Sequence, residues 1–267
     1  MSAPLSRKPG IPNAGLLSFG WIPVWRRNFL VWRKLAFPSL LGNLADPLIY
    51  MLGLGYGLGR MLPQISGVDY MQFLIAGMIV ASAMNAATFE SLYSAFSRMR
   101  TQKTWDAILV TPLSLDDVLA GELFWAASKS FLSGFSILLV ISALGLSSLP
   151  LALWVLPIIF LTGFAFAAIG LVVCALAPSY DFFMYYFTLF ITPMLMISGI
   201  FFPVENLPHS IYLIASWLPL SHAVRLVRPL LLGEYPKDIV LHVSVLLGVT
   251  IVAFRVAVFL TRRRLLN

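Results

Sequence analysis

The sequence predicts an all-α integral membrane protein with six transmembrane helices. Of its 267 residues, 60% are hydrophobic and only 11% are charged, and the mean hydropathy is +0.90. A soluble domain of this size could not cover so much apolar surface. A hydrocarbon core needs about 20 apolar residues per helical crossing. Six runs approach or exceed that length, at 36–59, 72–97, 118–146, 151–176, 182–202 and 239–261. We therefore expect one transmembrane domain over residues 1–267.

Residues 1–35 are predicted to form a cytoplasmic tail followed by an interfacial helix. Pro and Gly are frequent in the first twelve residues, which is typical of a loose segment. Beyond them, aromatic residues recur at helical spacing opposite a group of basic residues: Trp25, Phe29 and Trp32 against Arg26, Arg27, Arg33 and Lys34. This pattern indicates a helix that floats at the lipid headgroups. The alternative is one long first helix, kinked at Pro38.

The first span ends in the glycine-rich run LGLGYGLG. Gly53 with Gly57, and Gly55 with Gly59, make two overlapping pairs of small residues spaced four apart. Such pairs let two helix backbones approach closely inside a membrane. The pattern predicts close packing of this helix.

Residues 98–117 are the connection with room for structure of its own. Thr104 is a candidate cap for a short helix, and Pro112 would end it because the residue before proline avoids helical angles. We expect Trp105, Ile108 and Leu109 to share one exposed side of that helix, where they would dock a partner. The alternative is that Trp105 only anchors the loop in the lipid interface. Ser114, Asp116 and Asp117 suit the start of the next helix.

The run SGIFFPVENLP, residues 198–208, breaks an apolar stretch with polar and proline residues. We expect Pro203 to end the fifth span there, with Glu205 and Asn206 emerging into the polar layer. Gly199 would allow close packing, and Pro208 would start the next helix. The break is predicted to be a hinge at an outer gate.

Residues 203–238 are predicted to be an outer re-entrant region. Two apolar pieces, 209–218 and 221–232, are separated by Pro219, and each is too short to cross a bilayer. The second piece carries a polar stripe at steps of three: His222, Arg225 and Arg228. The stripe would meet lipid headgroups, a charged or sugar-bearing substrate, or water.

The distribution of Lys and Arg predicts that both termini are cytoplasmic. With the N-terminus inside, twelve basic residues fall on the cytoplasmic side: Arg7, Lys8, Arg26, Arg27, Arg33, Lys34, Arg98, Arg100, Lys103, Arg262, Arg263 and Arg264. Four fall outside: Arg60, Arg225, Arg228 and Lys237.

Several polar side chains lie in or near the predicted spans: Asn43, Asp46, Glu90, Glu122, Lys129, His242 and Arg255. Such groups are costly in lipid and usually face the interior of a bundle. We expect Glu122 and Arg255 to snorkel to the nearby membrane surface. Asp46 and Glu90 would line a cavity or pair between helices, so they are candidate substrate or lipid contacts together with Asn43.

No motif of the sequence points to catalysis. It has no phosphate-binding loop, no His-Glu-x-x-His motif and one cysteine, and its three histidines stand too far apart for a local metal motif. We therefore expect a non-catalytic chain without a cofactor or metal of its own and without a nucleic-acid partner.

The chain resembles the permeases of the ABC-2 exporter family over nearly its whole length, and within that family it is nearest to the nodulation protein J permeases. The resemblance is carried by VWRRNFLVWRK (24–34), LLGNLADPLIYMLGLGYGLG (40–59), AATFESLYSAFSRM (86–99), ALAPSYDFFMYYFTLFITPM (175–194) and SGIFFPVENLP (198–208).

This resemblance implies a homodimeric permease in a bacterial inner membrane, bound to two copies of an ABC ATPase that uses ATP and magnesium. Its substrate would be an amphiphile such as a lipo-oligosaccharide, a lipid-linked glycan or a drug-like molecule. The implied ATPase-coupling residues are Thr104, Trp105, Asp106, Ile108, Leu109, Thr111 and Pro112. The implied outer gate contains Ser198, Gly199, Phe201, Phe202, Pro203 and Glu205.

The alternative function is a secondary transporter driven by an ion gradient, which would need ionisable residues deep in broken helices. Asp46 and Glu90 are its candidate ion carriers, and Pro47 lies beside Asp46.

Overall fold

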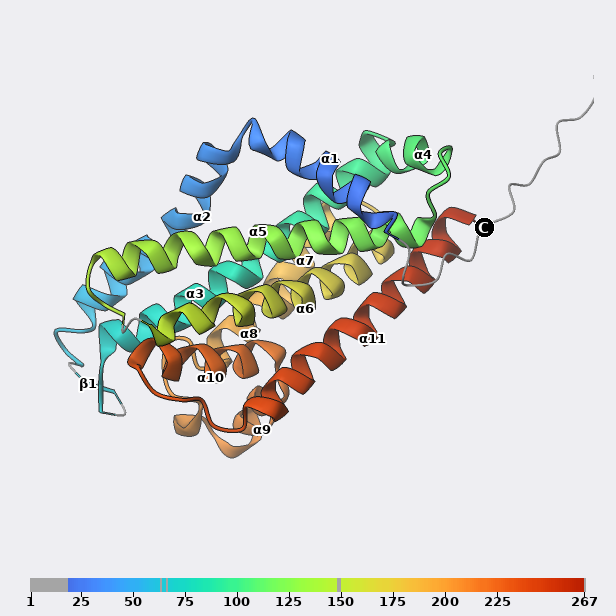
Figure 1. Ribbon diagram of the computed structural model, residues 1–267. Coiled ribbons are helices and arrows are strands. Elements are labelled where there is room, and N and C mark those ends of the chain that lie inside the picture. Colours follow the sequence, from blue (N-terminus) through green and yellow to red (C-terminus); the bar gives the residue numbers. More distant parts are fainter. Residues whose placement is uncertain (1–18, 63, 66, 148–149, 267) are drawn as a thin grey trace, which may run out of the picture.

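The protein is an all-α bundle, which confirms the all-α part of the prediction. The structure is a computed structural model that describes residues 19–62, 64–65, 67–147 and 150–266. Its long helices run side by side (Figure 1). They are α3 (Tyr70–Phe89), continued by the π-helices η2 (Glu90–Ser94) and η3 (Ser97–Thr101); α5 (Leu115–Ala143); α6 (Val155–Leu176), preceded by the 3-10 helix η4 (Leu151–Trp154); and α11 (Ile239–Leu266).

Four helices are long and apolar enough to cross a membrane: Tyr70–Thr101, Leu115–Ala143, Leu151–Leu176 and Ile239–Leu265. They match four of the predicted spans. The first predicted span contains α2 (Ala36–Tyr50), which runs into the π-helix η1 (Met51–Tyr56), and the fifth contains α7 (Asp181–Tyr186), η5 (Phe187–Ile191) and α8 (Thr192–Ile197). The stretch Asp181–Ile197 is shorter than the four long helices. Crossing by these two segments stays a prediction.

Helix α1 (Trp21–Arg33) lies along α5, and its aromatic side faces that helix. The Trp21 ring stacks on Phe124 with 4.1 Å between the ring centroids. The Trp25 indole N–H donates to Ser128 Oγ at 3.0 Å. The aromatic side of α1 is therefore packed on α5. The position of this helix at the lipid headgroups stays a prediction.

The approach of α1 to α5 depends on a glycine. A Cβ at Gly121 would lie 2.5 Å from the Cβ of Val24, so no larger residue fits without displacing α1. Helices α1 and α2 meet at an angle of 84°, with the break between Arg33 and Ala36. The alternative of one long helix kinked at Pro38 is therefore wrong. Residues 1–18 of the predicted tail lie outside the described residues.

The connections alternate between the two ends of the bundle. The short helix α4 (Thr104–Leu109) and the last turns of α11 lie at one end, and the hairpin of β1 (Gln64–Ile65) and β2 (Val68–Asp69) lies at the other (Figure 1). Gln64 pairs with Asp69, and Ile65 pairs with Val68. This arrangement agrees with the predicted even number of crossings.

Two arginines of α11 connect this helix to α5 and α6 at the end of the bundle where α4 lies. Arg262 forms an ion pair with Asp116 at 2.6 Å. The Arg264 guanidinium donates to the carbonyls of Cys174, Ala175 and Ala177 at 3.0, 2.7 and 2.6 Å. Because the last carbonyls of a helix lack helical donors, a cation at the end of α6 is favourable. Arg262 and Arg264 therefore hold the bundle together as well as contributing to the charge asymmetry.

The predicted pair of short helices before the last long helix is confirmed. Helix α9 (His209–Trp217) and α10 (Pro219–Leu232) follow the 3-10 helix η6 (Val204–Asn206) and meet at 83°. Helix α10 begins at Pro219, in the first helical position where proline is tolerated, two residues before the predicted second piece. Much of α10 is buried, in contact with α3, α6 and α11.

Of the two residues predicted to start helices α4 and α5, one is confirmed as a cap. Ser114 caps α5 through a capping box with Asp117, in which the Asp117 N–H donates to Ser114 Oγ at 3.2 Å. Thr104, however, is the first residue of α4 and not its cap. Lys103 precedes it with a left-handed φ of 50°, which turns the chain sharply into the short helix.

Candidate functional site

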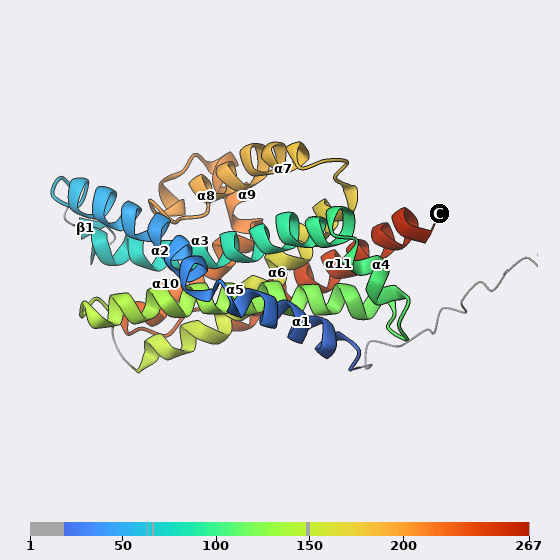
Figure 2. The same ribbon diagram turned by 90° about the horizontal axis from the view of Figure 1, so that it is seen from above.

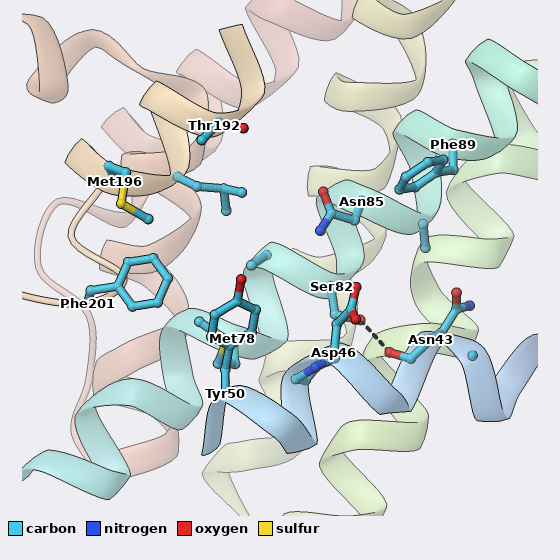
Figure 3. Close-up of a pocket in the computed structure, with 15 residues that line it drawn as sticks. Asn43, Asp46, Tyr50, Met78, Ser82, Asn85, Phe89, Thr192, Met196 and Phe201 are labelled. Carbon is cyan, nitrogen blue, oxygen red and sulfur yellow. Dashed lines mark hydrogen bonds between the residues drawn. The ribbon is translucent and has the colours of Figure 1, made fainter. Parts of the chain in front are cut away.

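A cavity of about 310 Å³ lies between α2, α3 and α8 (Figure 3). Figure 2 shows α7 and α8 on one side of α3 and α5 on the other. Asparagine, aspartate, serine and threonine side chains line the cavity together with aromatic and aliphatic ones. The lining includes Asn43, Asp46, Tyr50, Met78, Ser82, Asn85, Phe89, Thr192, Met196 and Phe201. This mixture suits an amphiphilic molecule.

The α2 wall of the cavity is shaped by Pro47. Because proline has no N–H, the carbonyl of Asn43 loses its helical donor. The Ser82 hydroxyl of α3 donates to that carbonyl at 3.3 Å, the dashed line in Figure 3. Ser82 also contacts the Ser133 hydroxyl of α5 at 2.7 Å. One serine therefore joins three helices where α2 is weakest.

Asp46 is exposed on the cavity wall and has no hydrogen-bond or ion-pair partner among the described residues. An unpaired carboxylate within an apolar helix normally faces a water-filled space. Asn85 of α3 and Thr192 of α8 line the same cavity (Figure 3). A carboxylate, a carboxamide and a hydroxyl together offer donors and acceptors for a polyhydroxylated ligand.

Aromatic contacts join the segment from α7 to Phe201 to helices α2 and α3 at both ends of the cavity. Tyr50 of α2 meets Phe201, which follows α8, edge to face with 6.0 Å between centroids. Phe89 of α3 stacks on Phe187 of η5 at 4.6 Å. Such contacts are individually weak. Among the described residues, no ion pair joins this segment to α2 or α3.

The predicted outer gate is a tight turn that is buried at its core. Helix α8 ends at Ile197, so the expectation that Pro203 ends it is wrong. The chain turns at Gly199, whose φ of +81° is a left-handed conformation that favours glycine. Ser198 is buried, and its hydroxyl donates to the carbonyl of Met194. Of the other gate residues, Pro203 is buried, Phe202 is half-buried and Glu205 is exposed.

Arg228 of α10 holds this turn. Its guanidinium lies 3.6 Å from the centroid of the Phe73 ring and donates to the carbonyl of Gly199. Burial of such a cation needs these compensating contacts. Arg228 therefore makes contacts within the bundle, and a contact with headgroups, substrate or water stays a prediction.

The rest of the predicted polar stripe also turns inward. His222 is buried and its Nδ1 lies 2.7 Å from Nδ1 of His242 on α11, so one imidazole donates to the other. Arg225 is half-buried. The histidine pair fastens α10 to α11. In the described part of the chain, no three His, Cys, Asp or Glu side chains are placed to hold a metal ion.

A second site lies at the α4 end, where four charged residues of the long helices form a buried charge cluster. Arg98 of η3 donates through Nε to Glu122 of α5 at 2.8 Å and through Nη2 to Glu90 of η2 at 2.8 Å. Lys129 of α5 pairs with the second oxygen of Glu90 at 3.2 Å. Trp125 donates its indole N–H to Glu90 at 2.9 Å. Two carboxylates thus meet two cations, which offsets much of the cost of burying them.

Two expectations change at this cluster. Glu122 was expected to snorkel, but it is 2% exposed and paired. Trp105 was expected on the exposed side of α4, but it is 1% exposed and its indole N–H donates to Glu122 at 3.1 Å. The tryptophan therefore seats α4 on the bundle. Arg255 is exposed on α11.

The exposed residues of α4 and of the turn that follows it are different ones. Asp106, Val110, Thr111 and Pro112 are exposed, and Val110 is 87% exposed. Ile108 and Leu109 are half-buried against the core. Val110 is therefore an exposed apolar position at the α4 end of the bundle.

The structure brings together some of the predicted residues and separates others. Asn43, Asp46 and Phe201 share the cavity, whereas Glu90 belongs to the charge cluster. Sequence reasoning missed the α3 contributors. Ser82, Asn85 and Phe89 recur at steps of three and four in an otherwise apolar run, and that spacing was a usable signal.

Comparison with known proteins gives a consistent family. The family model described as "ABC-2 type transporter" matches residues 21–232. The chain is 51% identical to "Nodulation protein J" of Rhizobium leguminosarum bv. viciae over 257 residues, covering 96% of this chain and 98% of that protein. It is 49% identical to "Nodulation protein J" of Rhizobium meliloti over 248 residues, covering 93% and 95%. It is 23% identical to "Inner membrane transport permease YadH" of Escherichia coli, covering 74% and 75%.

Proposed function

The chain belongs to the ABC-2 type transporter family, and we propose that it is the permease subunit of an ATP-driven exporter for an amphiphile. The observation that carries the proposal is the cavity between α2, α3 and α8, where a free carboxylate, a carboxamide and aromatic rings meet. Its substrate class is a lipo-oligosaccharide, a lipid-linked glycan or a drug-like molecule, taken from the cytoplasm or the inner leaflet of a bacterial inner membrane. The polar groups would bind the head and the rings the apolar part.

ATP hydrolysis takes place in a separate ABC ATPase chain, with its own magnesium, that docks on α4. The docking surface consists of Asp106 of α4 and the three exposed residues that follow the helix, Val110 to Pro112. Trp105 lies on the buried side of α4, and its hydrogen bond to Glu122 connects this helix to the charge cluster. A push on α4 would therefore reach α5 and the α3 span directly.

The working unit is a homodimer with two ATPase chains. A Cβ atom at Gly55 would lie 2.4 Å from the sulfur of Met71, so the Gly55 side of η1 packs on α3. Positions Gly53 and Gly57 have no atom within 4 Å and leave the other side open. A second copy can approach closely there. The open face of the cavity beside α2 would then lie toward the partner subunit.

The ion-gradient alternative has less support. Glu90, one of its two candidate carriers, is fixed by Arg98 at 2.8 Å and Lys129 at 3.2 Å. A carboxylate engaged by two cations is not free to bind a transported ion. Asp46 alone remains available.

Docking on α4 is tested by Val110→Asp. A new charge at an 87% exposed position leaves the fold intact but opposes an apolar contact with the ATPase. We expect co-purification of the ATPase with the permease to fall by about tenfold or more, as for loss of an interface contact of moderate strength. Val110→Ala, which keeps an apolar side chain, should retain the ATPase. Full retention by Val110→Asp would show that the ATPase docks elsewhere.

A further inference from the structure

A second cavity, of about 250 Å³, lies between α1 and the π-helical end of the α3 span. It is separate from the proposed substrate cavity and shares none of that cavity's lining residues. Its walls include the rings of Trp32 and Trp125, which meet edge to face at 5.8 Å. Its polar lining includes Arg27, Asn28 and Lys129.

Asn28 lines this cavity and has a buried, unused donor. The residue is 3% exposed, and its Oδ1 accepts a hydrogen bond from Arg27 Nη1 at 3.0 Å. Because a guanidinium only donates, this contact fixes which end of the carboxamide is oxygen. The Nδ2 group therefore points its hydrogens elsewhere, and it has no acceptor among the described residues. A buried donor of this kind calls for an oxygen from outside the chain.

The charges around the cavity leave a positive excess. Arg98 is matched by Glu122, and Lys129 is matched by Glu90. Arg27, by contrast, contacts only neutral oxygens in the described structure: Asn28 Oδ1, and Thr104 Oγ1 at 3.4 Å. A guanidinium in this position suits a phosphate or carboxylate oxygen.

The rim of the cavity is apolar. Val31 and Leu35 line it and are 55% and 64% exposed. Both lie near the α1–α2 bend, where lipid chains would pass in a membrane-embedded bundle. A cavity that favours an anionic group inside and apolar chains at its opening suits a negatively charged amphiphile.

We propose that this cavity binds the phosphate headgroup of an anionic lipid. The phosphate oxygens accept hydrogen bonds from Asn28 Nδ2 and Arg27, with Lys129 nearby, and the acyl chains leave past Val31 and Leu35. The bound lipid thereby ties α1 to the buried charge cluster. This site is additional to the export path and does not depend on which substrate is transported.

The test is native mass spectrometry of the purified full chain after exchange into phosphatidylglycerol or phosphatidylcholine. We expect wild type to retain phosphatidylglycerol preferentially. Arg27→Gln and Asn28→Leu should each weaken that retention by about tenfold, the loss expected for one charge-assisted or buried hydrogen bond. Arg33→Gln is the matched control, because it removes the same charge from an exposed position on the same helix. It should retain phosphatidylglycerol as wild type does.

Equal losses in Arg27→Gln and Arg33→Gln would overturn the proposal, since they would mean diffuse attraction to the headgroup layer. Wild-type retention in Asn28→Leu would overturn it as well. If that variant does not fold, the two arginine variants still decide. Glycerol phosphate is the probe for a free anion. Displacement of the lipid by glycerol phosphate at millimolar concentration would overturn binding of an amphiphile and assign the cavity to soluble phosphates.

Discussion

Replacing Glu122 by leucine is expected to destabilise the protein by about 3–5 kcal/mol, the usual cost of removing one partner from a buried ion pair. Arg98 would lose its contact through Nε and keep only Glu90, while the buried Trp105 N–H would lose its acceptor. Unfolding followed in detergent, by heat or by denaturant, measures the change. Because Trp105 seats α4 through this carboxylate, the variant should also lose ATPase binding.

Asp116→Asn is the matched control for Glu122→Leu. Asp116 is a carboxylate of the same helix and pairs with Arg262, but both side chains are partly exposed, at 33% and 42%. A pair of that kind contributes about 0–1 kcal/mol. Equal destabilisation by the two variants would contradict a special role for the buried cluster. A double variant, Arg98→Met with Glu122→Leu, should recover part of the loss, because no uncompensated cation would then remain at that position.

Asn85→Trp is expected to reduce export to background without unfolding the chain. Asn85 lies half-buried on the wall of the cavity between α2, α3 and α8, so an indole at this position projects into the space proposed for the substrate. The residue makes no hydrogen bond among the described residues, and its replacement removes no contact of the fold. Transport of a fluorescent lipo-oligosaccharide into inside-out vesicles measures the effect.

Asn85→Leu separates blocking from loss of a polar contact. Leucine branches at Cγ as asparagine does and is much smaller than tryptophan, so it leaves most of the cavity open but removes the carboxamide. We expect apparent affinity to fall by about three- to tenfold, as for one hydrogen bond, while transport continues. Export at the wild-type rate by Asn85→Trp would place the substrate path outside this cavity.

The apolar patterning predicted the all-α class and the four long helices well, since burial in lipid demands long continuous runs. What it could not predict was the partner of each amphipathic side. From its sequence alone, Trp25 fits a lipid interface and a groove on another helix equally well. It packs on α5 because Gly121 lets α1 approach that helix closely. The same ambiguity misled the prediction for Trp105, whose indole found a buried carboxylate.

The gate and the charge cluster show why long-range pairs escaped prediction. SGIFFPVENLP was recognised as a break, but its geometry depends on Arg228, 29 residues away along the chain from Gly199. Arg98 was counted as a loop cation, because nothing in the local sequence connects it to Glu122. Charge spacing along one helix is readable from sequence. Pairing between helices requires knowing which faces meet.

Uptake into proteoliposomes that hold this permease together with its ATPase tests the central claim most directly. With ion gradients collapsed by ionophores, the account predicts uptake of a labelled lipo-oligosaccharide that requires ATP and stops when the ATPase cannot hydrolyse it. The permease alone, with an imposed pH gradient, should transport nothing. Gradient-driven uptake by the permease alone, unaffected by ATP, would contradict the account and favour a secondary transporter that uses Asp46.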